Sequence, residues 1–433
     1  MAYAIDKIRT FGLVGVCAYA MRFLRSLGYS VRIKFDALLH PIEPEVGVTV
    51  VAAFGESNSL NKTMRDLVIM LKRAGIAYQT FDVTDGCRAN HDIDCLLTPK
   101  RNFRARRYRL VVEMMNGIYP RLRGIENARV VFWEAESGIT KAFPFVTDGR
   151  IAIAMSDFNY ATLKNEIGKK YAQKLLYPFV FDADKSASPS QIRSKYGIKN
   201  SAFMVFFNFD YTAFERKNPE AAIRAFSMAF KNDLDVVLVF KTVKGAEFAQ
   251  RRRRLYQVIR DMGIEGRFVE IDKYIPEKDI YGLTMACDVY LSLHRGEGFG
   301  LGIAEAMSIG KPVVVTDYSS TTEFCNADNS CLVPCSLVAM PDAAKYNVPY
   351  SWAIEKWADP DVSVAASMLS RLREDSALRT RLGNAAKEFI ESRYSISNFK
   401  RSALQLLDNV VGIIPPGVDA EAAYRAHVEE KYL

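Results

Sequence analysis

Asp288-Val-Tyr-Leu-Ser-Leu-His294 is typical of a buried strand, and it runs directly into the glycine-rich stretch Arg295-Gly-Glu-Gly-Phe-Gly-Leu-Gly302. A helix is predicted to begin near Leu301, and a second buried strand follows Gly310-Lys-Pro at residues 312–317. A strand, a glycine-rich turn, a helix and another strand form the repeating unit of a parallel sheet covered by helices. This part of the chain is therefore predicted to have an α/β fold.

The same alternation extends in both directions along the chain. Further strands are predicted at residues 47–54, 77–83, 108–114, 128–133, 150–155, 203–209, 235–241 and 267–271, and an early helix is predicted at residues 60–74. With 433 residues, 49% of them hydrophobic, the chain has enough material for two cores. We expect two Rossmann-like doubly wound domains, at residues 46–182 and 201–395, facing each other across a cleft. The polar stretch at residues 183–200 is expected to link them.

Both ends of the chain carry helical patterns outside these domains. Residues 1–45 form a basic amphipathic segment with a helix predicted at residues 5–27, which either lies in a membrane interface or packs on a domain. The best apolar run, residues 11–21, is bounded by Arg9 and Arg22 and is shorter than the ~20 residues of a membrane span. Residues 396–433 are expected to add helices, which either stay with the carboxyl-terminal domain or cross back to the amino-terminal one.

The cysteines and the net charge restrict the surroundings of the protein. The seven cysteines form no Cys-x-x-Cys pair, which favours free thiols in the cytoplasm, with the inner face of the membrane as an additional location. A net charge of +8 favours anionic partners. Basic residues cluster at residues 101–109 and 251–254. For the first cluster a solvated face and a contact with an anionic membrane are the alternatives, and a nucleic-acid-binding module lacks any recognition motif.

The glycine-rich turn carries residues suited to an anionic, hydroxyl-rich ligand. Gly298, Gly300 and Gly302 lack a Cβ atom, so backbone N–H groups near the start of a helix can approach an anion closely. Glu297 lies in the turn and Glu305 on the following helix, and each carboxylate can accept two hydrogen bonds from a diol. The turn and its two acids are therefore predicted to form a ligand site.

A second group of charged residues follows the first strand of the same domain. Arg216 and Lys217 precede Asn218, a favoured helix cap, and Pro219, a favoured first helical residue. Two cations beside a helix amino terminus suit a diphosphate, and they would stabilise the charge of a diphosphate leaving group.

The block from Val289 to Phe324 closely resembles the Glu-x7-Glu signature of family 4 glycosyltransferases. The stretch from Phe209 to Pro219 is similar to the diphosphate element of the bacterial polysaccharide branch of that family. The resemblance implies a GT-B fold, a nucleotide-diphosphate sugar donor, retention of anomeric configuration, and no required metal or other cofactor. It covers most of the carboxyl-terminal half of the chain.

The resemblance also implies roles for individual residues. Arg216 and Lys217 would hold the diphosphate, Glu297 the donor sugar and Glu305 the ribose. The following residues would complete the donor site: His294, Arg295, Gly298, Phe299, Gly300 and Leu301. Many relatives carry an arginine five residues before the lysine that corresponds to Lys217, and that position is Thr212 here. Arg216 is expected to contact the diphosphate in its place. A tryptophan-glutamate element at residues 132–136 offers Glu134 or Glu136 for contact with acceptor or donor.

The expected activity is the transfer of a hexose, from GDP-mannose or a UDP-hexose, to a glycan or a lipid-linked acceptor. A sugar-nucleotide epimerase on the same architecture is the nearest enzymatic alternative. A basic nucleic-acid-binding module is the alternative from a different class, and nucleic acid is not an expected partner.

Overall fold

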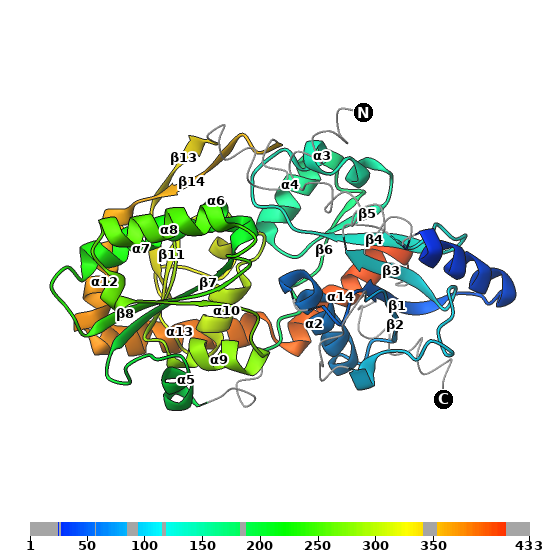
Figure 1. Cartoon of the computed structure of the whole chain (residues 1–433). Helices are drawn as coiled ribbons and strands as arrows, with labels where there is room; N and C mark the ends of the chain where they lie inside the picture. The colour runs from blue at the N-terminus through cyan, green and yellow to red at the C-terminus, as the bar shows by residue number, and fades with distance from the viewer. Residues whose placement is uncertain are drawn as a thin grey trace. The chain divides into compact units, whose positions relative to one another are not determined.

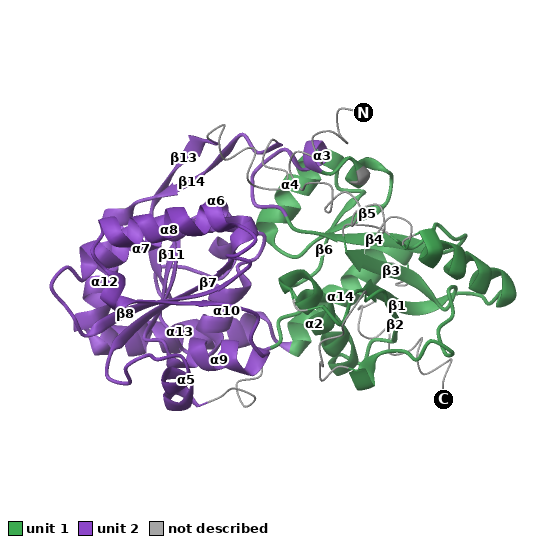
Figure 2. Ribbon diagram, viewed as in Figure 1, with its two compact units in different colours: residues 1–132, 143–180, 396–433 green, residues 133–142, 181–395 purple. Residues whose placement is uncertain are grey.

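The computed structural model describes residues 25, 27–56, 58–84, 94–114, 118–181, 188–340 and 353–412. The chain divides into two compact units, which Figure 2 distinguishes by colour. Unit 1 comprises residues 1–132, 143–180 and 396–433, and unit 2 comprises residues 133–142 and 181–395. The helix predicted at residues 5–27 lies almost entirely outside the described residues, as does the end of the chain after Gly412.

Unit 1 is built on a six-stranded parallel sheet in the order β2-β1-β3-β4-β5-β6. Its strands are rich in Val, Ile and Ala and are buried along most of their length, as expected for a parallel sheet with helices on both faces. The strands are β1 (Glu45–Ala52), β2 (Tyr78–Asp82), β3 (Tyr108–Met114), β4 (Glu126–Val131), β5 (Ile151–Ala154) and β6 (Ala172–Lys174).

Helices cover this sheet, and one of them comes from the far end of the sequence. On one face, residues 27–39 are helical and bury Ile33 against Val51 and Val111. Helix α14 (Ile396–Val411) contacts helix α2 (Ser59–Arg73) and strands β3 and β6. The other described elements of this unit are η1 (Asp94–Leu96), η2 (Pro144–Thr147) and α4 (Asp157–Ile167).

Unit 2 contains a second six-stranded parallel sheet, in the order β12-β11-β10-β7-β8-β9. The strands are β7 (Phe203–Asp210), β8 (Val236–Val243), β9 (Phe268–Asp272), β10 (Val289–Ser292), β11 (Val313–Thr316) and β12 (Cys331–Val333). This is the strand order of the Rossmann fold, in which the chain reverses direction across the sheet between its first and fourth strands. Here that switch point lies between β7 and β10, where a ligand site is expected.

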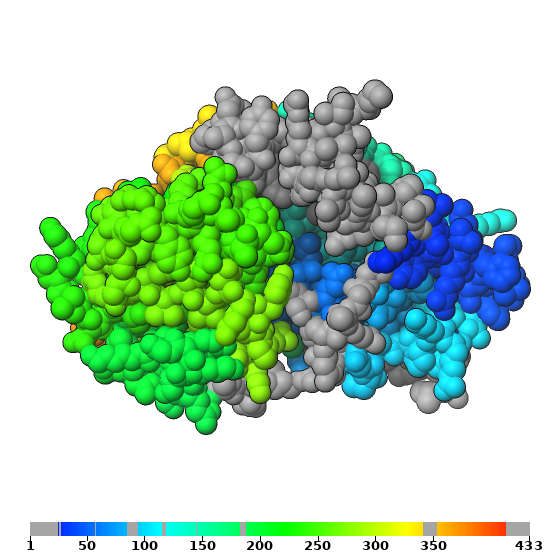
Figure 3. Space-filling view, in the orientation of Figure 1, coloured from blue at the N-terminus to red at the C-terminus, as the bar shows by residue number. Residues whose placement is uncertain are grey.

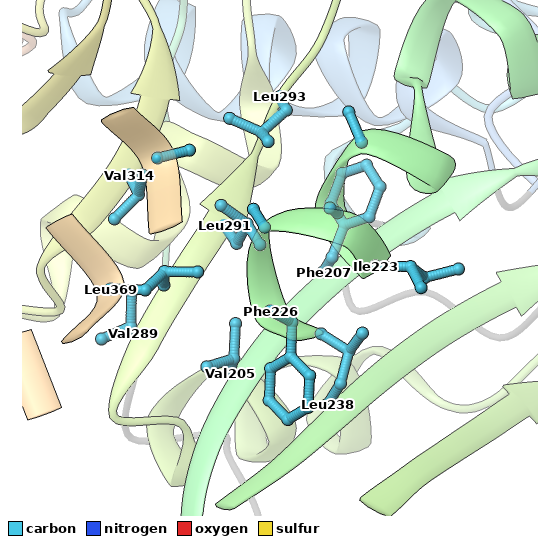
Figure 4. Packing of buried hydrophobic residues seen from close by; sticks show 14 of the residues in the cluster. Val205, Phe207, Ile223, Phe226, Leu238, Val289, Leu291, Leu293, Val314 and Leu369 are labelled. Atoms are coloured by element: carbon cyan, nitrogen blue, oxygen red, sulfur yellow. The ribbon is translucent and has the colours of Figure 1, made fainter. Parts of the chain in front are cut away.

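The helices of unit 2 lie on both faces of its sheet (Figure 1). Those on one face are α7 (Pro219–Ala229), α8 (Ala249–Asp261) and α12 (Val362–Glu374); on the other face lie α9 (Glu277–Ala286) and α10 (Leu301–Ser308). Alternate strand residues such as Val205, Phe207 and Leu291 pack against Phe226 and Leu369 (Figure 4). The remaining elements are α3 (Ile139–Ala142), α5 (Pro189–Lys195), η4 (Tyr211–Ala213), α6 (Phe214–Lys217), η5 (Glu265–Arg267), η6 (Ser319–Glu323), the antiparallel pair β13 (Cys335–Ala339) and β14 (Lys356–Pro360), and α13 (Ser376–Arg393).

The two-sheet α/β architecture is confirmed, and two boundaries differ from the prediction. Helix α5 lies inside the stretch predicted as a linker, because Pro189 and the Ser188 cap start a helix that buries Ile192. Residues 133–142 belong to unit 2 although they were assigned to the amino-terminal domain. The short strands β6, β12, β13 and β14 were not predicted.

The second basic run is part of an ion-pair network in unit 2. Arg251 lies 3.1 Å from Glu215, and Arg254 lies 2.7 Å from Glu220. Arg252 lies 2.8 Å from Glu270, a carboxylate that also accepts hydrogen bonds from tyrosine hydroxyls. Three of these four arginines are thus neutralised locally, and the run is no continuous positive surface.

None of the helices described by the structure has the length and the apolar character that crossing a membrane requires.

Candidate active site

The ends of strands β7 and β10 are held together by backbone and side-chain hydrogen bonds. The Arg295 N–H donates to the Arg216 carbonyl at 2.8 Å. The Asn218 side chain donates to the Leu293 carbonyl at 3.0 Å. Asn218 is the N-cap of helix α7, as predicted, but its backbone is left-handed, with φ of 55°, and its side chain forms no capping bond. Asn218 instead ties the α6–α7 junction to the turn after β10.

This junction brings Arg216, Lys217 and Glu297 into one cluster. The Lys217 ammonium donates to Glu297 Oε1, and Arg216 Nη1 lies 3.1 Å from Glu297 Oε2. Arg216 Nη1 also donates to the Gly296 carbonyl at 2.9 Å, and its Nε lies 3.6 Å from Glu134. The two cations at the end of β7 therefore meet the acid of the glycine-rich turn directly.

Burial and mutual attraction set the protonation states of this cluster. Burial opposes ionisation of Glu297, but Lys217 and Arg216 outweigh it and lower the pKa of Glu297 to about 2. Burial lowers the pKa of Lys217, an effect that the Glu297 carboxylate opposes. Burial raises the pKa of Glu134, while the neighbouring Arg216 lowers it. Near neutral pH Glu297 is a carboxylate that holds two cations at the switch point.

Two glycines of the turn are required by close contacts. A Cβ atom on Gly296 would lie 2.3 Å from the Glu134 carbonyl oxygen, so no side chain fits there. Gly300 has φ of +95° and a Cβ there would lie 2.6 Å from Thr321. Gly300 is also the residue from which α10 begins. The turn is thus compressed between residues 133–137 and the segment after β11.

The segment after β11 supports the turn, and sequence reasoning missed it. The Ser319 hydroxyl accepts the Glu297 N–H at 2.8 Å, and Ser319 has a positive φ of 66°. Thr321 contacts the His294 ring, with 3.3 Å between Oγ1 and Nε2. Residues 319–321 follow the carboxyl end of β11, so the rule that directs attention to strand ends in parallel sheets would have found them.

His294 is enclosed at the end of β10. Because the Thr321 hydroxyl donates to the Tyr318 carbonyl, His294 Nε2 is the donor in its contact with Thr321. His294 Nδ1 is then an acceptor that has no hydrogen-bond partner among the described residues. Burial lowers the pKa of His294 to about 4, with Lys217 and Arg216 adding to the effect and Glu297 opposing it. The ring is neutral at physiological pH.

Other residues predicted for the donor site differ in where their side chains lie. The Arg295 guanidinium lies 2.7 Å from Asp359 and 4.8 Å from the ring centre of Trp357, so β14 engages it. The Phe299 side chain is buried against Phe324. Only the backbone of Phe299 is therefore suited to a ligand, as for Gly298 and Gly300, which have no side chain. Leu301 is half-buried at the first position of α10.

Glu305 is buried on α10 and shares its surroundings with Glu297. Burial raises the pKa of Tyr290 well above its usual range, and Glu297 and Glu305 add to the effect. The Tyr290 hydroxyl donates to Asn208, and a Cβ atom on Gly302 would lie 2.4 Å from it. Both acids of the signature therefore lie near one buried tyrosine.

The tryptophan-glutamate element contributes one acid to the cluster. Glu134 contacts Arg216, whereas Glu136 is exposed and has no ion pair within the described part of the chain. A small pocket in unit 2 is lined by Glu134, Arg216, Arg295, Gly296, Met340, Ile354 and Trp357. Of the two candidates, Glu134 is the one that borders the arginine.

Within the described residues, no group of three or more histidines, cysteines, aspartates or glutamates is arranged to hold a metal ion. Cys325, Cys331 and Cys335 are free thiols, and burial raises the pKa of each.

The fold is GT-B, with two Rossmann-like units, and solved structures share it. Anabaena Alr3699/HepE in complex with UDP and glucose is 15% identical, with a TM-score of 0.58 over 84% of this chain and 100% of that chain. Sucrose-phosphate synthase from Thermosynechococcus elongatus is 16% identical, with a TM-score of 0.58 over 84% and 98% of the two chains. A glycosyltransferase from Rickettsia africae is 12% identical, with a TM-score of 0.57 over 84% and 98%.

Sequence comparison adds the class of enzyme to the fold. Residues 205–345 match the family model described as "Glycosyl transferases group 1". The matched segment contains Arg216, Lys217, Glu297 and Glu305. The protein is therefore a glycosyltransferase. The sequence matches no curated protein.

Proposed function

We propose that the protein is a retaining, metal-independent glycosyltransferase that moves a hexose from a nucleotide-diphosphate sugar to a glycan or lipid-linked acceptor in polysaccharide or glycoconjugate synthesis. The observation that carries the proposal is the cluster of Arg216, Lys217 and Glu297 at the switch point between β7 and β10. The Glu-x7-Glu spacing of Glu297 and Glu305 supports placing the proposal within family 4.

The charges of the cluster suit a departing nucleoside diphosphate. Glu297 neutralises much of the charge of Arg216 and Lys217. A diphosphate would compete for the same two cations, leaving Glu297 to accept hydrogen bonds from the donor sugar. The cations would then stabilise negative charge on the leaving phosphate as it develops. Because they supply this positive charge, we include metal independence in the proposal.

The reaction needs no separate protein base in this scheme. In a front-face displacement the departing phosphate takes the proton of the acceptor hydroxyl, and the new glycosidic bond forms on the side that the phosphate leaves. The proposal assigns the sugar to Glu297 and the ribose to Glu305. UDP-glucose is the first donor to test, since Alr3699/HepE, a protein with the same fold, was solved with UDP and glucose. GDP-mannose is the second.

The direct test is transfer with a panel of UDP- and GDP-hexoses, with and without EDTA, followed by NMR of the product anomer. We expect transfer with retention, unaffected by EDTA. Lys217→Ala and Glu297→Gln should lower kcat/KM by at least about a hundredfold. The matched controls Lys231→Ala and Glu265→Gln alter exposed residues of unit 2 and should retain activity. Near-normal transfer by the Lys217 or Glu297 variant would contradict the site assignment.

One further experiment separates a transferase from a sugar-nucleotide epimerase. Full epimerisation of a sugar nucleotide in the absence of acceptor would identify an epimerase.

The pair Glu134→Gln and Glu136→Gln tests the tryptophan-glutamate element. Loss of the charged contact to Arg216 should reduce kcat/KM about tenfold or more for Glu134→Gln, while Glu136→Gln should change little. Equal effects of the two variants would exclude a specific role for Glu134.

A further inference from the structure

The helix at residues 27–39 of unit 1 has two apolar faces, and among the described residues only one of them is packed. Its inner face buries Ile33 against the sheet, with Tyr29 and Ala37 beside it. Its outer face carries an apolar stripe, which we define as Leu27, Val31, Phe35, Leu38 and Leu39. All five residues of the stripe are exposed, Leu38 to 77%. The helix is the dark-blue one in Figure 1, and its residues form part of the surface in Figure 3.

The spacing of the stripe shows that its exposure is systematic. Positions 27, 31, 35, 38 and 39 fall within about a third of a turn on a helix of 100° per residue, opposite Ile33. Exposed Ile42 follows just after the helix ends. Single exposed apolar residues are common on protein surfaces, but a continuous stripe of large ones marks an interaction surface.

Positive charge borders the stripe on the helix and on the neighbouring loop. Exposed Arg32 and Lys34 flank the stripe on either side. The basic loop, which we define as residues 100–107 together with Tyr108 and Arg109 at the start of β3, docks on the same helix, because Asp36 accepts the Ala105 N–H at 2.7 Å. Phe103 joins the cluster of Ile33 and packs against Phe81 with the rings tilted and 4.8 Å between ring centres.

The arginines of this loop differ from the run at residues 251–254. The described residues place no carboxylate in an ion pair with Arg101, Arg104, Arg107 or Arg109, while Arg251, Arg252 and Arg254 have acidic partners. Arg101, Arg107 and Arg109 are exposed. The charge of the basic loop is therefore available to a partner outside the protein.

We propose that the apolar stripe and the basic loop together form a surface that binds an anionic lipid bilayer. A helix with an apolar face bordered by Lys and Arg inserts that face at the boundary of headgroups and acyl chains. Nearby basic residues add about 1 kcal/mol each at an anionic surface, equivalent to about fivefold in affinity. Nucleic acid would match the charge but leave Phe35 and Leu38 in water. The surface lies in unit 1, and the proposal does not depend on the donor chemistry of unit 2.

The test is sedimentation of the full chain with vesicles of phosphatidylcholine alone or mixed with phosphatidylglycerol, across a range of salt concentrations. We expect binding to the anionic vesicles, weakened by salt, and little binding to the neutral ones. Phe35→Glu/Leu38→Glu should weaken binding at least about tenfold. Arg101→Glu/Arg107→Glu should weaken it at least about twentyfold and reduce its dependence on salt.

Matched controls come from unit 2. Leu234→Glu replaces a leucine that is 81% exposed, and Arg253→Glu replaces an exposed arginine; both should bind like the unaltered protein. Light scattering without lipid should give all variants the same mass. Unchanged vesicle binding in the two double variants would overturn the proposal. So would a change of oligomeric mass in Phe35→Glu/Leu38→Glu, because the stripe would then be a contact between copies of the chain.

Discussion

At the scale of single residues, His294 links the stability of unit 2 to pH. Its ring is fully buried, and its folded-state pKa of about 4 lies below the ordinary value of 6.5. Between these values the unfolded chain binds a proton that the folded protein does not. The contribution of His294 is therefore fully present above pH 6.5 and is lost as the pH falls toward 4.

We predict that this loss reaches about 3 kcal/mol of the free energy of unfolding. Urea denaturation above pH 6.5 and again just above pH 4 measures it. Carboxylates also begin to titrate in this range, so the informative quantity is the difference between the protein and a His294→Asn variant. That variant should lose less stability on acidification. Identical losses would show that the buried ring does not resist protonation.

The residue scale is also where sequence reasoning was most informative about the site. Arg216, Lys217 and Glu297 were selected because of their residue types and their positions after predicted strands, and the structure brings all three into contact. Glu134 was offered together with Glu136 because spacing alone does not show which of two neighbouring acids faces inward. The roles of these residues toward a ligand remain predictions.

At the scale of elements, the start of helix α10 depends on a glycine. Gly300 is left-handed, and its missing Cβ leaves room for Thr321. Gly300→Ala should lower the free energy of unfolding by about 1–3 kcal/mol, because the new methyl group meets both backbone strain and a steric contact. It should also reduce transferase activity, since the turn that holds Glu297 must shift.

The control for this prediction is Gly266→Ala in the same unit. Gly266 has no positive φ, and a Cβ there would meet no heavy atom within 4 Å. Thermal denaturation of the two variants should separate them clearly, with Gly266→Ala within about 0.5 kcal/mol of the unaltered protein. If Gly300→Ala changed the free energy of unfolding as little as Gly266→Ala, the close contacts described for the turn would be incorrect.

At the scale of the whole molecule, helix α14 ties the end of the described chain to unit 1. It buries Phe399, Leu404 and Leu407, and its Ser402 hydroxyl accepts the Leu176 N–H at 2.8 Å. Residues close in sequence, such as Arg393 on α13, belong to unit 2. A defect in α14 should therefore destabilise the other elements of unit 1, which lie more than two hundred residues earlier in the sequence.

We predict that Leu404→Ala lowers the stability of unit 1 by about 2–5 kcal/mol, through lost apolar burial and a residual cavity. Hydrogen exchange should accelerate in α2, β3 and β6, which α14 contacts, while strands β7 to β11 keep their protection. Gln405→Ala, at an exposed position on the same helix, is the control and should leave exchange unchanged. Acceleration confined to unit 2 would contradict the assignment of α14.

The sequence alone was sufficient to predict the alternation of strands and helices and the strand ends that carry charged residues. These features are local: a parallel strand buried on both faces must be apolar, and a turn that passes close to other backbone must be glycine. The stretch from Asp288 to Gly302 displays both, which is why it indicated the fold.

Tertiary structure alone decided which distant segments meet. Ser319 supports Glu297, and residues 133–142 join unit 2. Arg251, Arg252 and Arg254 pair with acids, whereas the described residues place no acid in an ion pair with the arginines of the basic loop. It also showed that the helix at residues 27–39 keeps an apolar stripe exposed. The physical reason is that burial and ion pairing depend on which segments pack together. The periodicity of one segment does not show which other segment packs against it.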